Sequence, residues 1–160
     1  MVAFLYRMGA GVAGDVTRAE HALVQSSQID ASTPPTAFGS FVKRVNGKLR
    51  PLASGDAATV IKGLYVRNFP SGGAQDPIGT STPPVKGMGD ILRRGFMMVK
   101  LAQGSAVEDG QVYVRVTAAS GKFVSDIETA ADAGNCVAVA DCFFVGPADA
   151  NGIVEVEYKI

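Results

Sequence analysis

The sequence predicts a single all-β domain, built as a barrel or a sandwich of short strands. Its 160 residues include 19 glycines and 8 prolines but only 19% charged residues, a composition far from that of helical bundles. Several segments alternate apolar and polar side chains with a period of two. Turn-forming peptides rich in glycine, asparagine and serine separate these segments at short intervals. A chain of this length can bury a core without cross-links.

The first 35 residues are the least regular part of the sequence. Residues 15–28 are compatible with a short helix by composition, but Thr17, Val24 and the two adjacent serines weaken it. An extended arm is the alternative, and the pattern leaves both open. We expect residues 1–20 to form an N-terminal arm and residues 21–160 to form the β domain.

A β-hairpin is predicted at residues 38–52. Asn46-Gly47 stands between two strand-like segments, and this pair accepts the positive φ angles of a two-residue hairpin turn. Further strands are expected at residues 60–67, 91–101, 111–117, 123–127, 136–145 and 154–160.

Two of these segments show the alternation most clearly. In residues 111–117, three valines form the apolar row, and the residues between them point the other way: Tyr113, Arg115 and Thr117. Residues 154–160 repeat the pattern, with an apolar row of Val154, Val156, Tyr158 and Ile160. Both segments are typical of half-buried antiparallel sheet.

The segment 69–89 holds four prolines and five glycines without periodicity, which predicts a long exposed loop. The two cysteines, Cys136 and Cys142, would lie about 20 Å apart in a straight strand, whereas bridged Cα atoms lie within about 7 Å. We therefore expect free, partly buried thiols, and two isolated cysteines make no zinc pattern.

The charge balance argues against two classes of partner. Fifteen basic residues match fifteen acidic ones, so no net field attracts nucleic acid or an anionic membrane. The apolar N-terminus is interrupted by Arg7 well before a signal sequence or membrane span would be complete, which predicts synthesis in the cytoplasm. The basic pairs Lys43-Arg44 and Arg93-Arg94 lie in expected strands and indicate a soluble surface or a protein interface.

One motif is a candidate for nucleotide binding. Gly9-Ala10-Gly11-Val12-Ala13-Gly14 matches the dinucleotide fingerprint and precedes Asp30 at a plausible distance. The mechanism requires alternating strands and helices, which the rest of the chain lacks, so a glycine-rich arm or turn is the favoured interpretation.

No arrangement for catalysis or metal binding stands out. His21 is the only histidine, and no nucleophile elbow or zinc helix occurs. The carboxylate pairs Asp126/Glu128 and Glu155/Glu157 are interpreted as solvated strand faces. The peptide at Asp149 resembles the start of a calcium loop but lacks its later ligands, so it predicts a β-turn. We expect no enzyme activity, cofactor or metal.

The order of segments resembles the structural cement, or head decoration, proteins of tailed phages. The resemblance spans nearly the whole chain and is carried by Gly14-Asp15-Val16-Thr17-Arg18, Phe38-Gly39, Gly63-Leu64-Tyr65-Val66-Arg67, Asp90-Ile91-Leu92-Arg93-Arg94-Gly95, Gly110-Gln111-Val112-Tyr113-Val114-Arg115-Val116, Gly146-Pro147-Ala148-Asp149 and the last seven residues.

The resemblance implies a jelly-roll-like fold that assembles as a dimer or trimer on two-fold or three-fold positions of an HK97-like capsid. The major capsid protein would be the partner, and the protein, made in the host cytoplasm, would reside in the virion. Residues expected to bind partners are Phe4, Leu5, Tyr6, Arg7, Arg18, Arg93 and Arg94. Another virion component, such as a tail or attachment protein, and a small nucleotide-binding enzyme are the alternatives.

Overall fold

The computed structural model describes residues 10–67 and 82–160, and all structural statements below refer to these residues. Strands dominate, and no α-helix occurs in the described ranges, which confirms the all-β prediction. Two short 3₁₀ turns, η1 and η2, span Ala19–His21 and Ala58–Val60. The strands are β1 Leu23–Ile29, β2 Phe41–Val45, β3 Lys48–Pro51, β4 Ile61–Tyr65, β5 Met88–Gln103, β6 Gln111–Arg115, β7 Ile127–Glu128, β8 Cys136–Phe144 and β9 Ile153–Tyr158.

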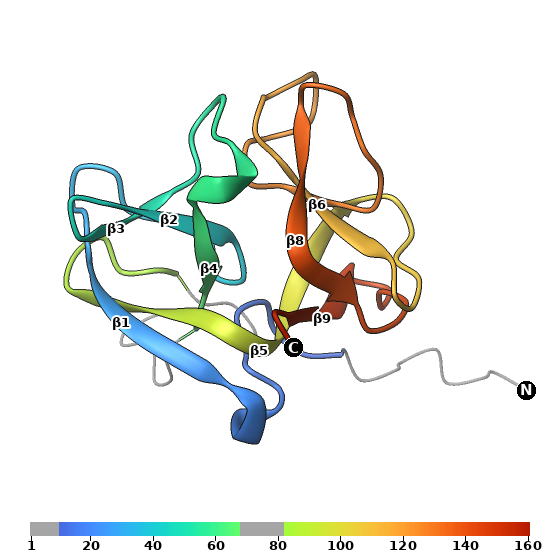
Figure 1. The fold of residues 1–160 in the computed structure, drawn as a ribbon, viewed down its shortest axis with the longest axis horizontal. Coiled ribbons are helices and arrows are strands. Elements are labelled where there is room, and N and C mark those ends of the chain that lie inside the picture. Colours follow the sequence, from blue (N-terminus) through green and yellow to red (C-terminus); the bar gives the residue numbers. More distant parts are fainter. Residues whose placement is uncertain (1–9, 68–81) are drawn as a thin grey trace, which may run out of the picture.

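The strand pairings close two rings that share β5. Its first half, residues 88–94, pairs with β1 and β4, and β2 and β3 complete the first ring. Its second half, from Gly95, pairs with β9 and β7, and β6 and β8 complete the second ring. Figure 1 shows the rings as two lobes, with β5 running along the bottom of the left lobe and continuing upward into the right one. The arrangement is consistent with the jelly-roll-like fold expected, while the two-ring closure was not predicted.

The predicted hairpin is confirmed. Strands β2 and β3 pair antiparallel from Val42↔Pro51 to Val45↔Lys48, and Asn46-Gly47 forms the turn between them. The φ angles of these two residues are 50° and 77°, in the left-handed region that asparagine and glycine tolerate best.

Consecutive residues of the first ring's strands face two different cores, because neighbouring side chains of a strand point to opposite faces. Val42 on β2 and Ile91 on β5 belong to a small cluster that also contains Ile29, Phe38, Leu49 and Tyr65. Their neighbours Phe41 and Leu92 belong to a larger cluster, which continues into the second ring through residues such as Val114, Phe144, Val156 and Tyr158. The larger cluster therefore joins the two rings.

Residues 10–18 follow the second half of β5 rather than opening a helix. The N–H of Gly14 donates to the carbonyl of Met98 at 2.8 Å, the N–H of Met98 donates to that of Asp15 at 2.9 Å, and Val16 bridges Met97. The nearest helical element after the glycine motif is the three-residue η1, so the helix N-terminus that the dinucleotide fingerprint requires is missing from the described residues.

Residues 15–28 are neither a short helix nor a simple extended arm. After η1 they enter β1, which pairs with β5 from Leu23↔Arg94 to Gln28↔Met88. The seven residues of β1 include four polar ones in a row, two glutamines and two serines at residues 25–28, so their own strand propensity is weak. Pairing with β5 decides their conformation.

Two other expected strands end differently. Residues 123–127 form mainly a turn: the N–H of Phe123 donates to Asp126 Oδ2 at 2.7 Å, and Ser125 has a φ of 78°. Only Ile127 from that range enters β7. At the C-terminus, β9 stops at Tyr158 because Lys159 adopts a φ of 57°, and Ile160 is exposed instead of completing the apolar row.

The residue expected to face outward on β6 is buried. Val112, Val114 and Val116 form the predicted inner row, but Arg115 on the opposite face is also inaccessible to solvent. Its guanidinium binds Glu128, with Nε–Oε1 at 2.5 Å, and Asp132, with Nη2–Oδ2 at 2.7 Å. Glu128, expected on a solvated face, is therefore the buried partner of a buried arginine. Periodicity missed both because it describes polarity and not pairing.

The remaining expectations have mixed outcomes. Both cysteines are free thiols in β8, as predicted. Most of the proline-rich segment 69–89 lies outside the described residues, and its last two residues already belong to β5. Among the described residues, no helix is long and apolar enough to cross a membrane.

Candidate functional site

The two arginines predicted to bind a partner lie where the two rings meet. Arg93 and Arg94 end the first-ring half of β5, and Gly95 starts the half that pairs with β9. Leu23, the first residue of β1, pairs with Arg94, and Tyr158, the last residue of β9, pairs with Gly95. Figure 1 accordingly places the C-terminus beside β5 near the end of β1.

A shallow groove of about 510 Å³ occupies this junction. We call it the junction groove. Its lining residues are Leu23, Val24, Gln25, Arg93, Arg94 and Lys159. Leu23 is 59% exposed and Val24 is 42% exposed, so two adjacent apolar side chains of this strand are open to solvent. The groove therefore combines an apolar floor with a cationic border.

Local backbone structure fixes the three cations. Arg93 and Arg94 are held by β5 pairing, and the side chain of Arg93 also reaches Gln25 Oε1 at 3.5 Å. The N–H of Lys159 donates to the carbonyl of Asp141 at 2.6 Å, and its ammonium lies 5.0 Å from the centre of the Tyr158 ring. None of the three forms an ion pair with a carboxylate of the described residues. Their charges remain available to a ligand.

Arg18 has a different environment from the other two predicted arginines. Its Nη2 lies 3.0 Å from Glu155 Oε2, and its guanidinium stacks 3.9 Å above the centre of the Phe96 ring. Thr17 donates to the same Glu155 carboxylate. These contacts fasten the segment before η1 to the second ring, and Arg18 does not line the junction groove.

The remaining predicted binding residues, Phe4, Leu5, Tyr6 and Arg7, lie outside the described residues. Conversely, four groove residues were not predicted: Leu23, Val24, Gln25 and Lys159. The adjacent apolar pair Leu23-Val24 indicates a possible contact surface, but it lies within residues 15–28, where the sequence leaves a short helix open. The sequence pattern does not predict Lys159 as a groove residue, because its position depends on where β9 ends.

The second ring holds the strongest charge cluster, and it is internal. Hydrogen bonds from Arg115 lower the pKa of Glu128 and of Asp132 below their usual values, despite the opposing effect of burial. Lys122 Nζ adds a longer contact to Glu128 Oε2 at 3.5 Å. This cluster ties the loop between β6 and β8 to the sheet, so it has a structural explanation.

Other residues considered for chemistry are also engaged structurally. His21 packs edge-on against Phe96, with 6.1 Å between ring centres. Asp149 accepts the N–H groups of Asn151 and Ile153 at 2.8 Å, and the N–H of Gly152 returns to its carbonyl, so the predicted β-turn is confirmed. Burial raises the pKa of the Cys142 thiol, which opposes thiolate formation. Across residues 10–67 and 82–160, no group of three His, Cys, Asp or Glu could hold a metal ion.

The groove is thus suited to binding a partner through apolar contact and positive charge. A search of curated proteins gave no match. Among solved structures, a chain from the capsid of Myoviridae phage XM1 has a TM-score of 0.73 with 22% sequence identity, covering 98% of this chain and 96% of that one. The likeness establishes a shared fold.

The family comparison reaches further than the fold. The model of the XM1 gp53 minor capsid protein matches residues 1–158, which is nearly the whole sequence. The predicted resemblance to a phage head-associated protein of the virion is confirmed at this level. The chain therefore belongs to the XM1 gp53 minor capsid protein family.

Proposed function

We propose that this protein binds the outside of an HK97-like phage capsid and cements neighbouring copies of the major capsid protein through the junction groove. Membership of a minor capsid protein family supports a structural role in the virion. The observation that carries the finer proposal is a group of three cations, without an ion pair to any carboxylate of the described residues, beside exposed Leu23 and Val24. Arginine is enriched among the residues that contribute most to binding energy at protein interfaces.

Cementing requires geometry rather than reactivity. A protein that touches more than one capsid subunit gains effective concentration after its first contact, so each contact needs only modest area. We include in the proposal that the protein forms a symmetric dimer or trimer, because symmetry repeats one groove at several lattice positions. Catalysis has no part in this role.

The N-terminal residues Phe4, Leu5, Tyr6 and Arg7 are proposed as a second, apolar contact. Arg18 is assigned a smaller share, because a partner would have to compete with its ion pair to Glu155. The junction groove therefore carries most of the proposed capsid affinity.

The test is binding to heads that lack the protein. Purified protein should sediment with such heads in a saturable manner and raise the temperature at which they release DNA, followed with an intercalating dye. The double variant Arg93→Glu/Arg94→Glu should weaken head binding by at least about tenfold, because both charges then oppose the partner.

The matched control is Lys86→Glu/Lys100→Glu, which changes the net charge equally at two exposed positions away from the groove. It should bind heads within about twofold of the unchanged protein. Equal losses of head affinity in both double variants would show that the interaction depends on net charge and not on the junction groove. Failure of the unchanged protein to bind heads would refute the proposed function.

A further inference from the structure

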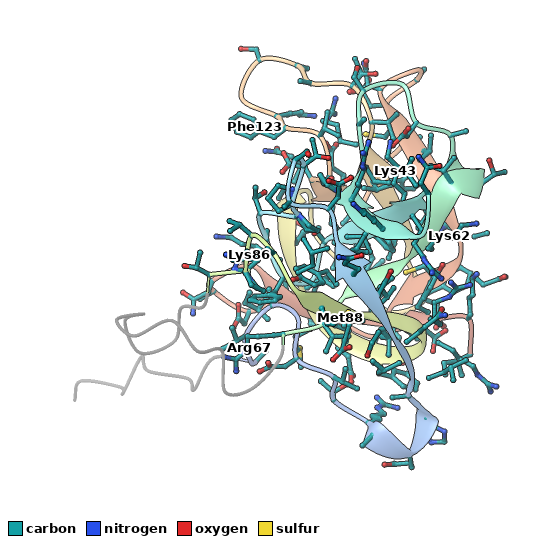
Figure 2. All side chains as sticks on the ribbon, turned by 90° about the vertical axis from the view of Figure 1, so that its left-hand side faces the viewer. Lys43, Lys62, Arg67, Lys86, Met88 and Phe123 are labelled. Atoms are coloured by element: carbon teal, nitrogen blue, oxygen red, sulfur yellow. The ribbon has the colours of Figure 1, made fainter. Side chains whose placement is uncertain are left out.

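The strand that forms the groove floor is open along part of one edge. β1 pairs with β5 over residues 23–28, but its other edge pairs with β3 only at Gln28 and Ile29. Within the described residues, no strand pairs with the second edge of residues 23–26. Figure 2, which views the molecule from the left-hand side of Figure 1, brings β1 to the front of the first ring.

An open edge offers unpaired N–H and C=O groups, since alternate residues of a strand direct both groups to the same side. Proteins usually protect such an edge with lysine, proline or an inward-pointing charge. The sequence Leu23-Val24-Gln25-Ser26 contains none of these. A register shift lies between Leu23 and Val24, yet the strand continues regularly from Val24. This edge is therefore competent to accept another strand.

The side chains around the edge define what the added strand must carry. Leu23 and Val24 require apolar side chains opposite them. Arg93, Arg94 and Lys159 line the same groove without a carboxylate partner among the described residues, so they require negative charge. A short extended segment that carries both apolar and acidic side chains can meet both demands, with its neighbouring side chains directed to opposite faces of the added strand.

Segments of this chain fit poorly as the occupant. The acidic strand β9 already pairs on both edges, with β5 and β8, and its Glu155 is bound to Arg18. Residues 1–9 are apolar but contain Arg7 and no acidic residue, so they would add positive charge to a positive groove. A segment from another protein is the better match.

We infer that residues 23–26 of β1 accept an extended segment of a partner protein, about four to six residues long with alternating apolar and acidic side chains, as an added β-strand. Backbone hydrogen bonds to β1 would supply affinity, and the cationic border would select the acidic segment. That the segment belongs to the capsid rests on the proposed function, whereas the binding mode rests on the edge and the groove alone.

The test uses synthetic peptides, so that it does not depend on heads. A labelled peptide acetyl-Ser-Val-Glu-Val-Glu-Val-Ser-amide should bind the unchanged protein in fluorescence polarisation at peptide concentrations below about 1 mM. The lysine version, with both glutamates replaced, should bind at least about tenfold more weakly, because it opposes the three cations. A version N-methylated at alternate residues should lose at least as much, because it cannot donate to the edge of β1.

Protein variants and amide exchange separate the contribution of the cations from that of the backbone hydrogen bonds to β1. Arg93→Glu/Arg94→Glu should lose the acidic peptide, while Lys86→Glu/Lys100→Glu should retain it. Amide hydrogen exchange should slow for some residues between 23 and 26 when the acidic peptide is bound, and not with the N-methylated version.

Three outcomes would overturn the inference: no binding of the acidic peptide at about 1 mM, equal binding of the N-methylated version, or unchanged amide exchange in residues 23–26. Peptide binding without head binding would leave the strand-addition mode standing and refute the proposed function. Head binding without peptide binding would refute the strand-addition mode and leave the proposed function standing.

Discussion

The two rings that share β5 differ in whether their charged side chains and strand edges have partners. In the second ring, Arg115 is inaccessible to solvent and is matched by Glu128 and Asp132. At the end of the first ring, Arg93 and Arg94 have no carboxylate partner among the described residues, and the neighbouring edge of β1 is unpaired. The difference teaches which half of the molecule is complete by itself and which half has unsatisfied groups to offer a partner.

The two rings are held together by a shared hydrophobic core. The larger cluster includes Phe41 and Leu92 from the strands of the first ring, and the Phe41 ring packs edge-on against Tyr158 of β9 with 6.2 Å between centres. We therefore expect the two rings to unfold as one cooperative unit.

The largest effect is expected at Gly63 in β4. Its backbone lies so close to β5 that an added Cβ would come within 2.1 Å of the Leu92 carbonyl oxygen, and its φ of 153° is itself unfavourable for other residues. Gly63→Val should destabilise the protein by more than about 4 kcal/mol, enough to prevent folding at ordinary temperature. Circular dichroism and thermal unfolding measure this.

Gly146→Ala is the control, because nothing lies near an added Cβ at that position. It should leave the melting temperature nearly unchanged. A Gly63→Val variant that kept the second ring folded would contradict a single cooperative unit.

The next effect concerns the internal charge cluster of the second ring. Arg115→Met leaves Glu128 buried without its counter-charge and should lower the melting temperature by about 10 °C. Arg18→Met, which breaks an ion pair whose arginine side chain is 42% exposed, should lower it by only about 2 °C. Adding Glu128→Leu to Arg115→Met should recover stability, since the buried carboxylate without a counter-charge is then removed. A double variant less stable than Arg115→Met alone would show that the unpaired Glu128 carboxylate is not the cause of the instability.

The smallest effect compares one tyrosine from each ring at alkaline pH. Burial raises the pKa of Tyr65 and of Tyr158 to about 12, above the usual value of about 10. The folded state therefore favours the neutral phenols, and their contribution to stability is complete below pH 10 and is lost as pH rises towards 12.

Tyr65→Phe removes one such group, and the Tyr65 hydroxyl has no hydrogen-bond partner among the described residues. At pH 7 the change should alter stability by less than about 1 kcal/mol, and at pH 11 the variant should be more stable than the unchanged protein. Denaturant titrations at both pH values test this. Equal alkaline sensitivity in the variant and the unchanged protein would show that Tyr65 does not contribute. Tyr158→Phe should behave alike at pH 11 if the rings unfold together.

Local patterns predicted those parts of the fold that local chemistry determines. Asn46-Gly47 specified the first hairpin, and the alternation around Val114 and Val156 identified two strands and their buried faces. The pattern failed at β1, where polar residues form a strand because β5 provides its hydrogen bonds. It also failed at residues 123–127, where the Asp126 side chain holds a turn.

The candidate site was predictable only in part for the same reason. Arg93-Arg94 stands out as a basic pair within an apolar strand, which indicated an interface. The groove around it depends on pairings between residues more than sixty positions apart, such as Leu23↔Arg94 and Gly95↔Tyr158. No short-range pattern contains that information, so Leu23, Val24 and Lys159 became visible only in the folded chain.

The shared strand has a mechanical consequence. Extended, the 16 residues of β5 would reach about 53 Å, and both rings are hydrogen-bonded along it. A pull applied at the junction groove along β5 would load the ladders of both rings in shear, so many hydrogen bonds must fail at once instead of opening one after another. A tether point at the middle of such a strand distributes force into both halves of the molecule.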